Sequence, residues 1–152
     1  MSAEAKLQEM GITLPEAPKP VAAYVPFTRS GDLVFTSGQI CMEAGQLKYK
    51  GKVGRDLTPE EGYQAARLCA INTLAVLKSA VGSLDNVAQI VKVTVFVNSA
   101  AGFTAQPAVA NGASEFYVQV FGDAGRHARS AVGAPELPLD TAVEVEVIAR
   151  VK

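Results

Sequence analysis

The sequence has few of the residues that a structural metal site requires. It contains two cysteines, Cys41 and Cys69, a single histidine, His127, and no tryptophan. Neither cysteine belongs to a Cys-x-x-Cys pair, and one histidine cannot form a ligand cluster, so a structural zinc site is excluded. Cys69 falls in an amphipathic helical segment, which favours a small core residue over a reactive thiol.

An excess of one charge is also missing. The 14 basic and 15 acidic residues give a net charge of -1, whereas nucleic-acid binders usually carry clustered Lys and Arg. No run of eighteen apolar residues occurs, and charged residues near the amino terminus occupy the place where a signal peptide needs an apolar stretch. We therefore expect a cytoplasmic protein with neither a nucleic-acid nor a membrane partner.

What is present suits one globular domain. Of the 152 residues, 49% are apolar, which is enough to bury about two-thirds of the surface that the unfolded chain exposes. We expect a single domain over residues 1–152, in which 1–20 form an amino-terminal helix and a proline-rich tether. Ser2 is the candidate cap of that helix and Gly11 its end. Pro15, Pro18 and Pro20 then favour an extended chain.

Local patterns predict the remaining elements. Thr58 to Glu61 spells a capping box for a long helix that Gly82 ends. A second helix is expected from Pro107 to Phe121. Strand-like runs are expected at four places: from near Ala22 or Ala23, Asp32–Ile40 with Gly38 as a bulge or close approach, Gln89–Val97 with Val91, Val93, Val95 and Val97 on one side, and a closing hairpin of Ala128–Val132 and Thr141–Val151.

This order of elements predicts an α/β (α+β) fold. It is not a regular alternation of parallel crossover units, and it suits one mixed sheet with two helices on one face. The other face would be left open. Strands as apolar as Asp32–Ile40 indicate that this face is buried against further copies of the chain.

The last expected strand carries the residues that are best suited to take part in a reaction. Glu144 and Glu146 share one face, and a hairpin would place Arg129 opposite one of them. The pair could be a surface ion pair of little energetic value. In a cleft, the arginine could instead bind a small carboxylate bidentately while a glutamate holds water. His127 would share the face of Arg129, and we interpret it as a structural or rim residue in preference to a catalytic one.

Two further polar residues are candidates for a site. Ser37 lacks the Gly-x-Ser-x-Gly pattern of a nucleophile elbow, and the single histidine makes a triad unpersuasive, so we interpret it as a hydrogen-bond donor. Asn111 lies off the apolar face of its helix, where it either faces solvent or lines a subunit interface.

Several segments together resemble the Rid (YjgF, reactive-intermediate deaminase) family. In chain order they are Tyr24, GDLVFTSGQ at 31–39, VTVFV at 93–97, ARSA at 128–131 and VEVEVIA at 143–149. The resemblance covers nearly everything from Val21 to Val151. The amino-terminal helix, Leu14-Pro15 and the segment Gly125–Ser130 resemble a longer branch of that family.

The resemblance implies a chorismate-mutase-like (YjgF) fold, a homotrimer whose sheets form a central barrel, and clefts between subunits. It implies hydrolysis of small 2-imino or enamine acids to 2-keto acids and ammonia, with no cofactor. Arg129 aligns with the arginine that binds the substrate carboxylate, and Glu144 with the acid that positions the attacking water. Tyr24, Ser37 and Asn111 align with residues that line the cleft, and Gly38 would let substrate approach the backbone.

The sequence departs from the best-known members at some positions, and other functions stay open. Ala131 stands where those members have a cysteine two places after the arginine, and the loops after Gln39 and around 100–106 differ, so the substrate is not fixed. We expect an enzyme. The alternatives are a regulatory trimer that binds a small acid without turnover, an endoribonuclease or translation inhibitor, and a chorismate mutase, the last supported by fold analogy alone.

Overall fold

A computed structural model describes residues 1–20 and 22–152. Val21, the first residue of the segment that resembles the Rid family, lies outside the described residues. The helices are α1 Ala3–Glu9, α2 Pro59–Val81 and α3 Gln106–Phe121, with short 3-10 turns η1 Leu84–Asn86, η2 Gly122–Gly125 and η3 Pro138–Asp140. The strands are β1 Phe27–Ser30, β2 Leu33–Thr36, β3 Gln39–Ile40, β4 Met42–Glu43, β5 Gln46–Leu47, β6 Val87–Asn98, β7 Ala128–Ala134 and β8 Val143–Val151.

The long helix α2 forms as its sequence predicts. The Thr58 hydroxyl accepts from the Glu61 amide at 3.1 Å, and the Glu61 carboxylate accepts from the Thr58 amide at 3.0 Å. This reciprocal pair satisfies donors that the first turn leaves free. Gly82 ends the helix with a φ of 82°, a conformation that glycine adopts readily. Within residues 1–20 and 22–152, no helix is both long and apolar enough to cross a lipid bilayer.

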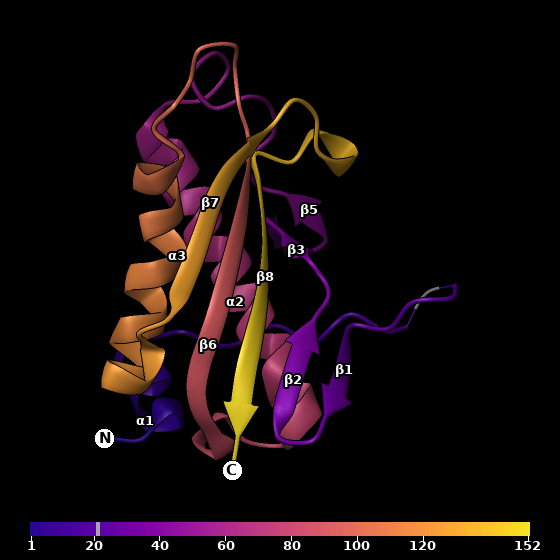
Figure 1. Ribbon diagram of the computed structural model, residues 1–152, viewed down its shortest axis with the longest axis vertical. Coiled ribbons are helices and arrows are strands. Elements are labelled where there is room, and N and C mark those ends of the chain that lie inside the picture. Colours follow the sequence, from indigo (N-terminus) through magenta and orange to yellow (C-terminus); the bar gives the residue numbers. More distant parts are fainter. Residues whose placement is uncertain (21) are drawn as a thin grey trace.

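The main sheet is mixed, in the order β1-β2-β8-β6-β7, with β3 also paired to β8. Strands β6 and β7 are parallel and are joined through α3, whereas the other pairs are antiparallel. In Figure 1, α2 passes behind β6 and β8, and α3 runs beside it near the β7 edge. The expected mixed sheet with helices on one face is therefore confirmed, and it contains one parallel crossover unit, β6-α3-β7.

The expected closing hairpin is wrong. Strands β7 and β8 do not pair, because β6 lies between them and pairs with both. The connection from 135 to 142 contains η3, in which Leu139 and Asp140 have φ values of 58° and 59°. This loop carries the chain past β6 to its far side, where β8 enters antiparallel to β6, β2 and β3.

The two faces of the sheet differ in what they contact. Val93, Val95 and Val97 of β6 pair with Val147, Val145 and Val143 of β8, and all six are buried in the core beneath the helices. The opposite face presents Phe35, Phe96, Glu144, Glu146, Ile148 and Val132, of which Phe35 is 37% and Val132 43% exposed. In the single chain this face therefore leaves apolar side chains open.

Strand β6 corrects a detail of the predicted alternation. Its pairing with β8 shifts register between Val87 and Gln89 and again between Ile90 and Lys92. Such irregularities change which residues face the core. Ile90 is consequently buried, while Val91, expected on the face of Val93, is only half-buried.

The predicted strand Asp32–Ile40 is interrupted in its middle. Strand β2 ends at Thr36, β3 begins at Gln39, and Ser37 and Gly38 lie in the gap. There the Thr36 hydroxyl accepts a hydrogen bond from the Val147 amide at 3.1 Å. The expected break at Gly38 is thus confirmed, and it allows β3 to pair with a different part of β8.

The amino-terminal helix belongs to the core. Ser2 caps α1 as predicted, and Ala3 and Leu7 are buried in the main apolar cluster. Glu4 accepts from the Leu84 amide at 3.0 Å and pairs with Lys78 at 3.1 Å. The first strand begins at Phe27, later than the expected Ala22 or Ala23, which lie in a turn.

Candidate functional site

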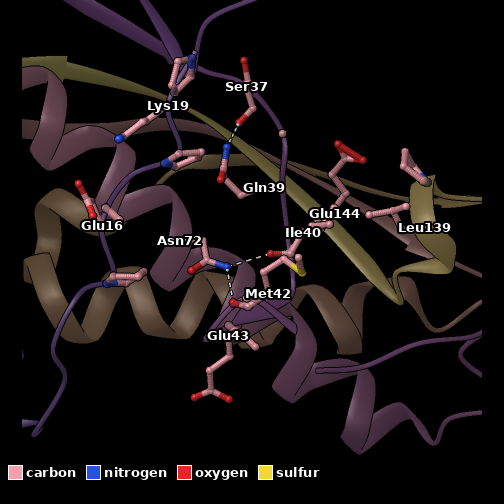
Figure 2. Close-up of a pocket in the computed structure, with 18 of the residues that line it drawn as sticks. Glu16, Lys19, Ser37, Gln39, Ile40, Met42, Glu43, Asn72, Leu139 and Glu144 are labelled. Carbon is pink, nitrogen blue, oxygen red and sulfur yellow. Dashed lines mark hydrogen bonds between the residues drawn. The ribbon is translucent and has the colours of Figure 1, made fainter. Parts of the chain in front are cut away.

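Four of the six candidate residues line one pocket of about 580 Å³ beside the break between β2 and β3. They are Tyr24, Ser37, Gly38 and Glu144. Figure 2 shows Ser37 and Glu144 with Leu139 next to the glutamate. The pocket volume lies in the range of small-molecule sites, about 300–1,000 Å³. The interrupted strand, the tether and the η3 loop thus enclose a space suited to a metabolite.

Ser37 connects the break in the sheet to the segment after Tyr24. Its hydroxyl donates to the carbonyl of Val25 at 2.6 Å, and its amide donates to the carbonyl of Pro26 at 2.7 Å. The hydroxyl hydrogen is therefore engaged, while the oxygen's lone pairs remain able to accept. Since His127 bonds Ser114 and not Ser37, no histidine is placed to activate this serine as a nucleophile.

Glu144 lies against the backbone at Gly38. A Cβ on Gly38 would come within 2.9 Å of the Glu144 Cδ and closer still to Oε1, so only glycine leaves the carboxylate where it is. Among residues 1–20 and 22–152, no hydrogen-bond donor contributes to the pKa of this carboxylate. Burial raises the pKa of Glu144, and the nearby charge of Glu146 raises it further. The result is an accessible carboxylate suited to proton transfer.

Arg129 lies elsewhere, on β7 beneath α3. Its Nη1 donates to Asn111 Oδ1 at 2.9 Å and to Ser114 Oγ at 3.1 Å. Both acceptors are neutral, and within the described part of the chain the half-buried guanidinium forms no ion pair. An arginine held by neutral groups keeps its whole charge available for an anion.

His127 closes the same cluster, as its shared face with Arg129 predicted. Its Nδ1 lies 2.6 Å from the Gly125 carbonyl oxygen and its Nε2 lies 2.8 Å from Ser114 Oγ. The ring contacts Tyr117 edge to face, with centroids 5.9 Å apart. Burial lowers the pKa of His127, and the charge of Arg129 adds to this effect.

The candidate residues therefore form two groups and not one. Tyr24, Ser37, Gly38 and Glu144 make the first, and Asn111 and Arg129 make the second. The expected cross-strand contact between Arg129 and Glu144 is wrong within one chain, because Arg129 is paired with Val93 and Glu144 with Phe96 and Ile40. Their failure to meet follows directly from the insertion of β6 between β7 and β8.

Sequence reasoning missed some polar residues around these groups. Asn72 of α2 is 9% exposed and donates to the carbonyls of Ile40 and Met42 at 2.9 and 3.0 Å, which fixes the β3–β4 segment to the helix (Figure 2). Ser114 joins Arg129 to His127. Its position three residues after Asn111 puts both on one helix face, a spacing that could have indicated it.

The cysteines do not enter either group. Cys69 is fully buried, and burial raises the pKa of its thiol well above the ordinary range, as suits a core residue. Among the described residues, no three His, Cys, Asp or Glu side chains gather in a way that could hold a metal ion.

Comparison with known proteins places these features in a family. A family model described as "YjgF/chorismate_mutase-like, putative endoribonuclease" matches residues 4–151. Protein TCP17 of Trypanosoma cruzi is 45% identical over 145 residues, which cover 95% of this chain and 91% of that protein. A 2-iminobutanoate/2-iminopropanoate deaminase of Dermatophagoides farinae is 32% identical over 137 residues, covering 90% and 92%.

A solved structure agrees. The protein Atu1372 of Agrobacterium tumefaciens, described as of unknown function, superposes with a TM-score of 0.93 at 44% identity, covering 99% of this chain and 92% of that one. The sequence match along nearly the whole chain, together with the mixed sheet backed by helices, leads to one conclusion: the chain belongs to the YjgF (Rid) family and has its chorismate-mutase-like fold.

Proposed function

We propose that this protein hydrolyses small 2-imino acids to 2-keto acids and ammonia in clefts between the subunits of a homotrimer. The observation that carries the proposal is the state of Arg129: a half-buried guanidinium, held by Asn111 and Ser114, with no carboxylate of the described chain beside it. Such a group favours a small anionic ligand. The name of the D. farinae relative supports the choice of imino acids.

The reaction needs little beyond binding and a positioned water. Arg129 binds the substrate carboxylate, and this holds the imine carbon at a fixed place. Glu144 orients a water molecule and accepts a proton as the water oxygen bonds to that carbon. Transfer of that proton to the nitrogen gives an intermediate that carries a hydroxyl and an amino group on the same carbon. The hydroxyl proton then moves to the amino group as the C–N bond breaks, so that ammonia leaves and the carbonyl of the keto acid forms. Water supplies the oxygen, so oxidant and reductant are both unnecessary.

The raised pKa of Glu144 suits this role. A carboxylate that is partly desolvated and close to another acid is a stronger base than one in water. Its contact with the Gly38 backbone fixes its position, and the open pocket around it leaves room for water and substrate. Tyr24 and Ser37 then form the wall of the same pocket.

The separation of Arg129 from Glu144 supports a site shared between chains. Two strand spacings, roughly 10 Å, separate β7 from β8, and the two side chains project from opposite faces of the sheet. A second copy that packs its β7 edge against the first pocket would bring an arginine to the glutamate. The open face with Phe35 and Val132 offers the apolar contact that such an assembly requires.

A coupled assay tests the proposal. A pyridoxal-phosphate dehydratase acting on serine or threonine generates the enamine and imine, and the release of pyruvate or 2-oxobutanoate is followed with and without this protein. We expect faster release with the wild type and no acceleration with Arg129→Ala. A wild type that does not change the rate overturns the proposed deaminase.

Two added measurements separate the alternatives. Saturable binding of a 2-keto acid in calorimetry without acceleration in the assay indicates a regulatory trimer. RNA cleavage that persists in Arg129→Ala in metal-free buffer would instead support the endoribonuclease in the family description. The net charge of -1 gives no electrostatic support to that activity.

A further inference from the structure

The hydrogen bonds around His127 have only one consistent direction. The Gly125 carbonyl can only accept, so His127 Nδ1 carries a hydrogen and donates it across 2.6 Å. In the neutral ring Nε2 then has a lone pair and accepts. The hydrogen it receives is that of the Ser114 hydroxyl, 2.8 Å away. Burial, which lowers the pKa of His127, favours this neutral form.

The direction of the Ser114 hydrogen bond determines how Ser114 contacts Arg129. Having donated its single hydrogen to His127, the Ser114 oxygen presents its lone pairs to Arg129 Nη1, which donates at 3.1 Å. The other Nη1 hydrogen goes to Asn111 Oδ1 at 2.9 Å. Both hydrogens of one guanidinium nitrogen are therefore engaged, and the plane of the group is fixed.

The opposite edge of the guanidinium stays available. Among the described residues no acceptor bonds Arg129 Nε or Nη2. These two nitrogens form one of the edges with which arginine donates two parallel hydrogen bonds to a carboxylate. The directions of the bonds thus select the edge that meets a ligand.

We propose that Ser114 and His127 are positioning residues that hold Arg129 so that its Nε–Nη2 edge receives the substrate carboxylate. This inference rests on the proposed function, because it assigns the roles of two residues that touch Arg129 and not the substrate. Tyr117 supports the arrangement by fixing the His127 ring edge to face. His127 therefore positions Arg129 through Ser114 and takes no part in the proton transfers of the reaction.

A measurement without ligand tests the arrangement itself. His127 is the only histidine, so its imidazole signals in ¹⁵N NMR are free of overlap from other histidines. We expect the Nδ1-protonated neutral ring in the wild type at pH 8. The Arg129 guanidinium signals, assigned by their loss in Arg129→Met, should show hindered rotation that becomes fast in Ser114→Ala. An Nε2-protonated ring, or a rotation unchanged by Ser114→Ala, overturns the inference.

Ligand affinity provides the functional test. Loss of one hydrogen bond to a charged group should weaken binding of 2-oxobutanoate about tenfold in Ser114→Ala, and His127→Phe should weaken it to a smaller extent. KM should rise in both while kcat changes less. Ser114→Thr, which keeps the hydroxyl, should restore affinity. Ser79→Ala, which removes an exposed serine hydroxyl on α2, is the matched control.

The outcomes are separable from those of the deaminase assay. Affinity that is equal in the wild type and in Ser114→Ala contradicts the positioning role even if the protein is a deaminase. A wild type that neither binds nor turns over the acids contradicts the proposed function, and the NMR measurement then decides whether Ser114 and His127 hold Arg129. Alanine is the best helix former, so Ser114→Ala is expected to fold, and its thermal unfolding verifies this.

Discussion

Arg129 and Glu144 project from opposite faces of one sheet, and β6 lies between the strands that carry them. In a single chain the proposed anion-binding group and the candidate base therefore do not face the same small molecule. The proposed function requires the pocket at Gly38 of one chain to combine with the cluster under α3 of another.

Mixing two inactive variants tests whether the site is shared. Arg129→Ala and Glu144→Ala should each lack activity, but trimers reassembled from equal amounts of both should recover it at about a quarter of the clefts, where an intact arginine meets an intact glutamate. Keto-acid release after mild denaturation and refolding of the mixture measures the recovery. Activity that stays at zero after mixing argues that both residues are needed in the same chain.

Arg129→Lys should not replace the arginine, despite keeping the charge. An ammonium cannot donate two parallel bonds from a planar edge, nor engage Asn111 and Ser114 as Nη1 does. We expect binding of 2-oxobutanoate to fall by a factor of roughly thirty or more, corresponding to at least about 2 kcal/mol. Calorimetry measures this, with exposed Arg126→Lys as control. Near-native affinity would show that charge alone suffices.

Gly38→Ala should lower the activity of the protein with little loss of stability. The added methyl group would displace the Glu144 carboxylate, whose Cδ is 2.9 Å from the position of the new Cβ. We expect kcat to fall at least about tenfold, because a misplaced base costs much of its contribution. Gly133→Ala is a matched control, since its Cβ also meets the ends of polar side chains, those of Gln106 and Ser99, away from the pocket. Equal activities of the two variants would contradict the role of Glu144.

Glu146→Gln should shift the acid limb of the rate profile. The charge of Glu146 contributes to the raised pKa of Glu144, after burial. Removing a like charge favours the ionised form, so the pKa of Glu144 should fall and activity should persist to lower pH. The pH dependence of kcat/KM measures this. Glu43→Gln, on the same pocket but paired with Lys48, should leave the limb unchanged. A shift toward higher pH would exclude Glu144 as the base.

His127 should make the fold sensitive to acid. Its pKa is lowered in the folded chain by burial and by Arg129, and Tyr117 is the other titratable group against its ring. Below the pKa of histidine in the unfolded chain, about 6.5, the unfolded chain binds the proton more readily than the folded one. The stability of the fold therefore decreases as the pH decreases. Above that value the effect is absent. Urea unfolding at pH 5 and 8 should therefore show a smaller difference in His127→Phe than in the wild type. Equal differences would contradict the prediction.

The sequence predicted those parts of the fold that local patterns determine. The capping box at Thr58, the glycine that ends α2 and the apolar face of α3 each depend on neighbours within one or two helical turns. Strand partners depend on residues far apart in the chain, and proximity in sequence favoured a hairpin of β7 with β8. In the structure β7 instead pairs in parallel with β6, to which it is connected through α3.

For the candidate site, too, the sequence indicated individual residues but not their arrangement in space. Motif resemblance identified the residues, and the structure gathers Tyr24, Ser37, Gly38 and Glu144 in one pocket. The distance between these four residues and Arg129 could not be predicted from the sequence, because it depends on the order of the strands in the sheet. Ser114 was missed because a serine on a helix surface resembles a solvent-facing one, and only its spacing of three residues from Asn111 indicates that the two share a helix face.

The anchoring of α1 has a consequence for the pocket. Glu4 fixes α1 beside η1 and the end of α2. The prolines at 15, 18 and 20 restrict the backbone conformations of the tether that follows. Glu16 and Lys19 thus stand at the pocket because of chain length and stiffness. A chain that began after Lys19 would lose one wall of the cavity together with the core contacts of Ala3 and Leu7, so the amino-terminal segment links ligand selectivity at the pocket to the stability of the fold.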